Sequence, residues 1–145
     1  MQGPYPQGPA QIITQWTIGN PAAGAQFTQT IPTGKMWKIL GFKVDFTASA
    51  VAGNRTFRFA FKDSAGKIFW VCDSEKTVTI SGAAFFSIGN AGFAPTVVAG
   101  ANESLVPCPS LCIPSGGQIT SLVQGMDGGD QWTLGGFNAE EYLMP

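Results

Sequence analysis

The sequence has few charged side chains for its length. Lysine and arginine account for 8 of its 145 residues and aspartate and glutamate for 9, which makes 12% of the chain charged. A typical soluble domain has about 25% charged residues. An isolated globule with so little charge would disperse poorly in water, whereas a subunit whose surface is largely covered by partner chains would not. The composition therefore predicts a subunit of an assembly in preference to a free enzyme.

Histidine is absent from the sequence. This absence removes the commonest general base and the commonest metal ligand, and it excludes catalytic arrangements of the Ser-His-Asp and Cys-His types. No glycine-rich phosphate-binding loop follows a strand and opens a helix, so nothing favours a nucleotide site. We therefore expect no catalytic residue and no cofactor, and we interpret the protein as a non-enzyme.

Cysteine is also scarce, with three residues in the chain. Cys108 and Cys112 are the close pair, and Cys72 is distant from both in the sequence. A zinc site needs four ligands, which three cysteines without histidine do not supply. On an extended strand Cys108 and Cys112 would lie roughly 13 Å apart, too far for a disulfide bond. We therefore expect free thiols and no metal site.

Two further absences concern location and partners. No run of about 20 apolar residues is present, so a membrane span is not expected. The first nine residues have neither the basic start nor the apolar stretch of a signal peptide, which predicts synthesis in a cytoplasm and reduced cysteines. The net charge of −1 and the lack of a cationic cluster argue against nucleic acid as a partner.

Alternation of apolar and polar residues is the main pattern that is present. Phe57, Phe59 and Phe61 recur at every second position, which predicts a strand with one buried face and with its arginines and lysine on the other. The predicted core consists of Phe42, Val44, Phe46, Phe57, Phe59, Phe61, Ile119 and Val123. Strands are expected near residues 11–18, 25–31, 36–40, 42–47, 55–62, 68–72, 77–81, 83–88, 104–113, 118–124, 131–134 and 137–143.

Turns that contain glycine and proline separate these strands. Residues 63–67 predict a hairpin, and residues 52–54 and 125–130 predict further reversals. The segments Ile31-Pro32-Thr33-Gly34 and Ile113-Pro114-Ser115-Gly116 are alike, and in each we expect proline at the second position of a turn and glycine at the fourth. We interpret the two segments as matching corners.

The number and spacing of the strands predict an all-β fold, an antiparallel β-sandwich of the jelly-roll type over residues 11–145. The stretch 82–103 is expected to form a strand and then a long loop across the end of the sandwich. Residues 1–10 contain three prolines and two glycines, which predicts an extended N-terminal arm. Two interpretations of this arm stay open: a frayed terminus, or a segment that orders against a neighbouring subunit.

Acidic pairs and tryptophans are the remaining candidates for chemistry. Glu140 and Glu141 are adjacent on an expected strand, so they should point to opposite faces and cannot flank one glycosidic bond. Asp127 and Asp130 lie in a glycine-rich loop, where a solvated turn is favoured over a calcium site. The four tryptophans could form a stacking platform for sugars or single-stranded nucleic acid. We favour packing in the core or in subunit interfaces for them. They are Trp16, Trp37, Trp70 and Trp132.

Several short motifs follow one another in order along the chain. A Pro-x-Gly-Lys-x-Trp strand start occupies 32–37, and a small-residue loop that ends in Gly-Asn-Arg occupies 48–55, before an alternating strand to Lys62. A Pro-x-Gly turn at 114–116, a Gly-Asp-Gln-Trp element at 129–132 and an acidic-aromatic strand at 140–142 come later. In this order, over residues 30–143, the motifs resemble those of small structural proteins encoded in the virion gene clusters of tailed bacteriophages and prophages. The resemblance implies a jelly-roll virion protein, and some proteins of this kind act as cement or decoration on the capsid.

The resemblance and the low charge together predict a capsid cement or decoration protein that binds the outside of a bacteriophage head and stabilises the shell. The expected partners are the major capsid protein and further copies of this chain, with trimers as one arrangement that suits the symmetry axes of a capsid. The candidate contact residues belong to the arm, to the loops near 48–54, 89–103 and 125–130, and to one strand: Gln2, Pro4, Tyr5, Pro6, Gln7, Asn54, Arg55, Arg58, Asn90, Phe93, Asn102, Asp127 and Asp130.

Other functions stay open beside this one. One is a lectin-like or host-attachment fibre module, which would need exposed aromatics beside carboxylates or amides. Another is a head-to-tail or tail structural subunit. An enzyme is the least favoured alternative.

Overall fold

The computed structural model describes residues 11–13, 19–89, 96–97 and 102–144. Within these residues every regular element is a β-strand. The strands are β1 (Gln11–Ile13), β2 (Thr28–Thr30), β3 (Lys35–Thr47), β4 (Arg55–Lys62), β5 (Ile68–Val78), β6 (Ala83–Gly89), β7 (Thr96–Val97), β8 (Glu103–Pro107), β9 (Leu111–Ile113), β10 (Gln118–Gln124) and β11 (Gln131–Leu143).

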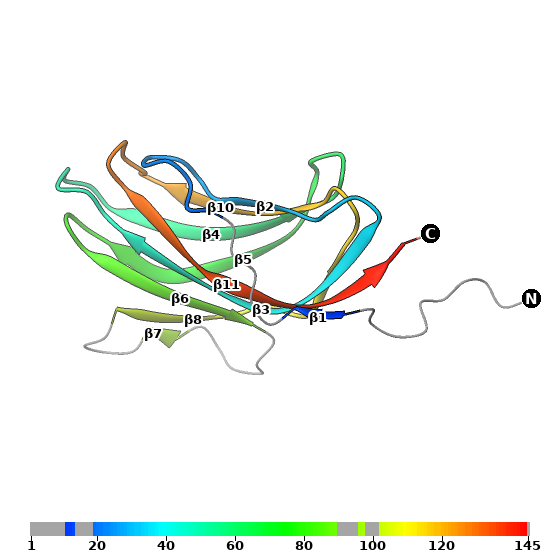
Figure 1. Ribbon diagram of the computed structural model, residues 1–145. Coiled ribbons are helices and arrows are strands. Elements are labelled where there is room, and N and C mark those ends of the chain that lie inside the picture. The colour runs from blue at the N-terminus through cyan, green and yellow to red at the C-terminus, as the bar shows by residue number, and fades with distance from the viewer. Residues whose placement is uncertain (1–10, 14–18, 90–95, 98–101, 145) are drawn as a thin grey trace, which may run out of the picture.

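The strands form two curved sheets that pack face to face (Figure 1). The smaller sheet has the order β2-β10-β4-β5, and the larger sheet contains the run β1-β11-β3-β6. The chain crosses from one sheet to the other between most consecutive strands, and the late strands β10 and β11 return to lie between early ones. This order is that of a jelly roll, so the predicted fold class is confirmed.

The alternating residues form the core as predicted. Each of the eight predicted core residues is buried, and the aromatic rings of the two sheets meet edge to face, as in the 4.8 Å approach of Phe46 to Phe57. Trp37 and Trp132 are fully buried among them, which confirms core packing for these two tryptophans. Trp70 differs, because 45% of its surface is exposed.

The strand boundaries differ from the prediction in three places. Two short strands were expected on either side of Gly41, and two more on either side of Gly135-Gly136. Each pair is a single continuous strand in the structure, β3 and β11 respectively. The register of β11 shifts at its two glycines, which form a bulge. The strands expected at 68–72 and 77–81 are one strand, β5, which ends at Val78. It ends there because residues 79–82 turn and the N–H of Gly82 bonds to the carbonyl of Thr79 at 3.1 Å. The strand expected at 104–113 divides into β8 and β9 around residues 108–110.

One pair of strands is parallel, although an antiparallel arrangement was expected. β8 runs beside β6 in the same direction, with Ser87 opposite Leu105. A parallel neighbour needs a connection of about a dozen residues or more, and residues 90–102 between the two strands provide that length. The short strand β7 within this connection pairs with the far side of β8.

The two Ile-Pro-x-Gly segments are matching corners, as predicted, and they lie against each other. The N–H of Ile31 bonds to the carbonyl of Gly117 at 2.8 Å, and the N–H of Gly116 bonds to the carbonyl of Ile31 at 3.1 Å. Gly34 and Gly116 both have φ of 74°, a conformation that favours glycine.

The positions within each corner turn differ from the prediction. The closing hydrogen bonds run from Lys35 to the carbonyl of Pro32 and from Gly117 to that of Pro114. Proline is therefore the first residue of each turn and glycine the third, in place of the second and fourth.

The N-terminal predictions fall mostly outside the described residues. β1 pairs with β11, with Ile12 opposite Glu140, so a short strand is present at the start of the expected segment 11–18. The proposed arm at 1–10 and Trp16 lie outside the part of the chain that the structure describes, as do the expected contact residues Gln2, Pro4, Tyr5, Pro6, Gln7, Asn90 and Phe93.

Candidate functional site

The expected contact residues of two loops, 48–54 and 125–130, meet at one end of the sandwich, around the guanidinium of Arg55. This side chain makes a two-pronged ion pair with the carboxylate of Asp130, with Nε to Oδ2 at 3.0 Å and Nη2 to Oδ1 at 3.1 Å. Its Nη1 also donates to the carbonyls of Val51 and Gly53 at 3.0 and 2.8 Å. The pair is almost fully enclosed, because Arg55 is 1% exposed and Asp130 is 0% exposed.

Asp130 joins the loops from the other side of this ion pair. Its carboxylate accepts the backbone N–H groups of Ser49 and Asp127, both at 2.8 Å. Burial by itself would raise the pKa of Asp130, but the hydrogen bonds from Arg55, Ser49 and Asp127 outweigh that effect and hold the pKa below its usual range. The carboxylate is therefore kept charged inside the loop cluster.

Asp127 closes the same cluster nearer to solvent. Its Oδ1 accepts the N–H of Gly129 at 3.0 Å and the hydroxyl of Ser49 at 2.9 Å, and these bonds lower its pKa. Both carboxylates are thus engaged by groups of their own chain. We predicted a solvated turn for this loop. That prediction is wrong for Asp130, because Asp130 is buried.

The burial of Arg55 corrects another expectation from the alternating pattern. Position 55 is two residues before Phe57, so its side chain shares the inner face of β4 with the phenylalanines. The opposite face was expected for it. Arg55 and Asp130 stabilise the loops from within, and neither offers a surface to a partner in this structure.

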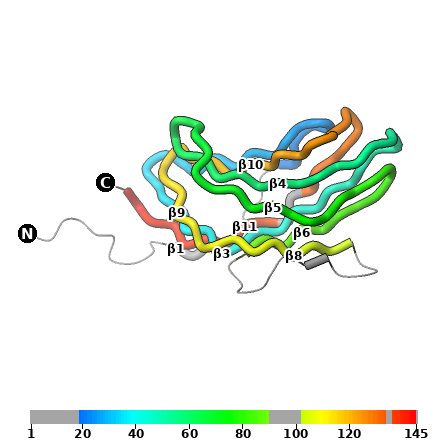
Figure 2. The backbone as a smooth tube through the Cα atoms, turned by 180° about the vertical axis from the view of Figure 1, so that it is seen from behind, coloured from blue at the N-terminus to red at the C-terminus, as the bar shows by residue number. Residues whose placement is uncertain are grey.

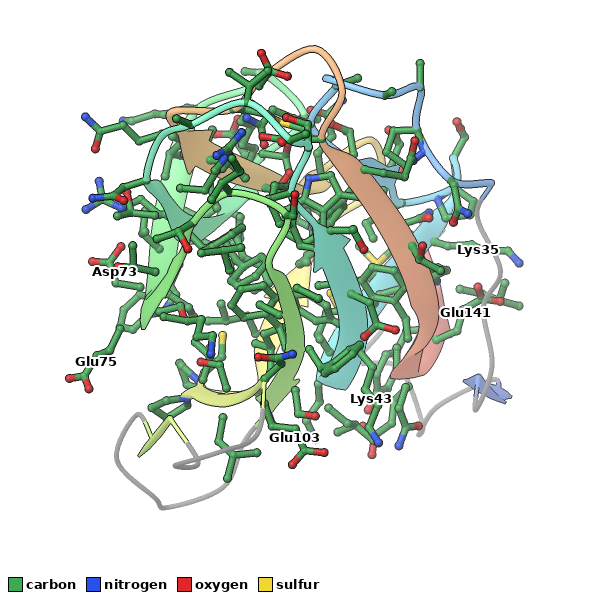
Figure 3. The ribbon with its side chains drawn as sticks, turned by 90° about the vertical axis from the view of Figure 1, so that its left-hand side faces the viewer. Lys35, Lys43, Asp73, Glu75, Glu103 and Glu141 are labelled. Atoms are coloured by element: carbon green, nitrogen blue, oxygen red, sulfur yellow. The ribbon has the colours of Figure 1, made fainter. Side chains whose placement is uncertain are left out.

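A second buried carboxylate lies at the other end of β11. Glu141 is 3% exposed, and it accepts Lys35 Nζ at 2.7 Å and the indole N–H of Trp37 at 2.8 Å. Burial opposes ionisation here, but the bonds from Lys35 and Trp37 outweigh it and lower the pKa of Glu141. Figure 3 shows Lys35 and Glu141 on one side of the molecule, opposite Asp73 and Glu75.

Glu140 has a separate set of partners. Its Oε2 lies 3.1 Å from Lys38 Nζ and accepts the Tyr142 hydroxyl at 2.8 Å. Glu140 and Glu141 therefore engage different neighbours, as their adjacency on a strand predicted, and they do not form the acidic pair that glycoside hydrolysis requires.

The outer face of the smaller sheet has a shallow hollow of about 450 Å³. Arg58 of β4 and Asp73 of β5 form an exposed ion pair at its rim. The apolar residues Phe57, Leu122 and Val123 also line it. The remaining lining residues are polar: Gln26, Thr56, Ser74 and Gln124. Arg58 is thus accessible, as a contact residue must be.

Three consecutive large apolar residues are exposed at the start of β5. Ile68, Phe69 and Trp70 have 43%, 42% and 45% of their surfaces exposed, and β5 is the outermost strand of its sheet. We call this set the β5 apolar patch. These residues were not among the predicted contact residues. The sequence does carry a signal for them: the run Ile-Phe-Trp-Val is apolar at every position, whereas a strand with one buried face alternates apolar and polar residues.

The remaining predicted contact residues lie at the surface. Asn54 and Asn102 are both exposed, next to Arg55 and at the start of β8 respectively. The described residues contain no group of three or more cysteine or acidic side chains placed to hold a metal ion. In the same part of the chain, no helix is long and apolar enough to cross a membrane.

Comparisons with protein-family models, with curated proteins and with solved structures found no match to this chain. The candidate partner surfaces are accordingly defined by the geometry above: the hollow beside Arg58 and the β5 apolar patch. The loop cluster around Arg55 supports the fold from within.

Proposed function

We propose that the protein is a structural subunit of a bacteriophage virion, a capsid cement or decoration protein that binds the outside of the head. The jelly-roll fold and the ordered motifs between residues 30 and 143 support this proposal. Its partners would be the major capsid protein and other copies of this chain. Its action would be adhesive, because contacts made only in the assembled state stabilise that state.

The observation that carries the proposal is the β5 apolar patch. An isolated protein rarely leaves adjacent large apolar side chains in water on an edge strand, and such patches mark interaction sites. The chain as a whole presents little charge to oppose close contact, since 12% of its residues are charged and Arg55, Asp130 and Glu141 are buried in ion pairs. We place the principal partner contact at this patch.

Co-sedimentation with phage heads tests this proposal. Purified protein is mixed with expanded and with unexpanded heads of the phage whose genome encodes it. The native chain should pellet with at least one form. A Phe69→Ser/Trp70→Ser chain should bind at least about 10-fold more weakly, because each buried aromatic contributes roughly 1.5–3 kcal/mol.

A matched control replaces exposed apolar residues elsewhere on the molecule. Ile80 and Leu143 are 51% and 64% exposed and lie outside both the patch and the predicted contact loops, so an Ile80→Ser/Leu143→Ser chain should bind like the native one. Failure of the native chain to pellet with either form of the head would contradict the proposal.

The hollow beside Arg58 favours a second candidate, the lectin-like module. Amide, hydroxyl and carboxylate groups around an apolar floor match the surface of a neutral sugar. Binding of the purified protein to a glycan array, with loss of the signal in an Asp73→Asn chain, would favour this candidate over the capsid role.

A further inference from the structure

Two cysteines that are far apart in the sequence lie at the same edge of the sandwich. Cys72 is on β5, opposite Phe59 of β4, and Cys108 directly follows β8. β5 belongs to the smaller sheet and β8 to the larger, and the two strands run side by side (Figure 2). The hydroxyls of Ser74 and Ser104 meet across this edge at 3.0 Å.

Cys72 and Cys108 are neighbours in the core at this edge. Both residues are buried, at 4% and 5% exposure, and both belong to the same hydrophobic cluster. The neighbouring Cys108 lowers the pKa of the Cys72 thiol, while Cys72 and burial together raise the pKa of Cys108. One sulfur is therefore the more readily ionised, and the second lies beside it with a proton to give.

Trp70 is two residues from Cys72 on the same strand, so the two side chains are on one side of β5. Almost half of the surface of Trp70 is exposed, and Trp70 contributes to the lowered pKa of Cys72. We therefore expect a small oxidant to reach Cys72 from the solvent at the edge of the sheet, beside Trp70. Cys112, in contrast, is exposed on β9 opposite Lys38, away from this pair.

We propose that Cys72 and Cys108 form a redox-active dithiol that hydrogen peroxide converts into an intrachain disulfide bond joining the two sheets. The Cys72 sulfur attacks one oxygen of the peroxide, the O–O bond breaks, and Cys72 becomes a sulfenic acid as water leaves. The Cys108 sulfur then attacks the Cys72 sulfur, the S–O bond breaks, and a second water carries away the Cys108 proton. In sum, two thiols and one peroxide yield one disulfide and two waters.

The expected consequence is a more stable sandwich. The bond would close a long loop between positions 72 and 108 and tie together two sheet edges that the Ser74–Ser104 hydrogen bond already joins in the reduced chain. Cross-linking over a loop of this length should raise the melting temperature by about 10 °C. This inference does not depend on the capsid role, since every step involves the isolated chain.

The test treats reduced, purified full-length protein with a small excess of hydrogen peroxide. The intact mass should fall by two hydrogen atoms, and the free thiols measured after denaturation should fall from three to one. No lysine or arginine follows Lys76, so trypsin leaves Cys108 and Cys112 on one peptide. The bond is therefore mapped in a Cys112→Ser chain, in which peptide 68–76 should be linked to the peptide that contains Cys108.

The variants separate this pair from other thiol chemistry. The Cys112→Ser chain should lose two hydrogens and gain melting temperature like the native protein. The Cys72→Ala and Cys108→Ala chains should do neither, and circular dichroism before oxidation shows whether each is folded. Three free thiols after treatment, a bond that includes Cys112, or a link between two chains would each overturn the proposal, whatever the result with phage heads.

Discussion

Arg55 connects two loops, 48–54 and 125–130, through one planar side chain. Its guanidinium donates five hydrogen bonds, to Asp130, Ser49 and the carbonyls of Val51 and Gly53. The ring of acceptors satisfies a cation that would otherwise be costly to bury. Asp130 in turn holds Ser49 and Asp127 by their N–H groups, so the loss of either partner leaves several polar groups unpaired.

Removing one member of this buried pair should destabilise the fold strongly. We expect Asp130→Asn or Arg55→Leu to lower the free energy of unfolding by about 3–5 kcal/mol, because an unpaired charge or donor set stays buried. Urea unfolding followed by tryptophan fluorescence measures this. The matched control is Asp73→Asn in the exposed pair with Arg58, where about 0–1 kcal/mol is expected. Equal effects at the two sites would contradict the account.

The buried carboxylates predict how stability depends on pH. The pKa values of Asp130 and Glu141 are both lowered in the folded chain. The two carboxylates therefore contribute fully to the free energy of unfolding above the ordinary carboxyl pKa of about 4. This contribution is lost as the pH falls through their lower pKa values in the folded chain. Urea midpoints should fall steeply below pH 4, and they should be flat from pH 6 to 8, where histidine is the usual titrating side chain and none is present.

The direction of this trend is open to a simple check. A chain whose urea midpoint stays constant or rises between pH 4 and pH 2 would show that these carboxylates are not stabilised by their partners. Glu141→Gln should reduce the slope in that range, because one of the two groups no longer titrates.

Among the elements, the two corners show how local sequence sets the jelly roll. Each corner places a glycine at φ of 74° between two strands, and the corners bond to each other through Ile31 and the Gly116-Gly117 backbone. The Ser115 hydroxyl also accepts the N–H of Gly34 at 3.0 Å. Two segments more than 80 residues apart in the sequence thereby fix where the two sheets meet.

A substitution at the first corner isolates the backbone effect. Open space surrounds the position that a Cβ would occupy on Gly34, so Gly34→Ala adds no clash. We expect a loss of about 1 kcal/mol from the left-handed conformation alone. Gly34→Asn should lose less, since asparagine tolerates this region. Thermal or urea unfolding of the three chains gives the ranking, and an alanine variant as stable as the native chain would contradict it.

The sequence predicts the strands better than their pairing. Alternation at Phe57, Phe59 and Phe61 identifies a buried face because that signal is local. The parallel pairing of β8 with β6 depends on a long connection and leaves no local signal. Arg55 was misplaced because its charge was given more weight than its position in the same alternation.

For the molecule as a whole, the candidate surfaces lie outside the rigid loop cluster. Figure 1 shows β5 at the border of the smaller sheet, and the β5 apolar patch occupies its first three residues. The sequence could not place this patch, because exposure of a continuous apolar run is decided by which strand ends the sheet. The proximity of Cys72 and Cys108 escaped prediction for a similar reason, since it depends on how the edges of two different sheets pack together.

The composition of purified virions tests the proposed function most directly. Particles of the phage that encodes the chain are banded on a density gradient, and their proteins are quantified by mass spectrometry against the major capsid protein. The account predicts that the chain bands with the heads in many copies per particle. Particles that contain every other structural protein but lack this chain would contradict it.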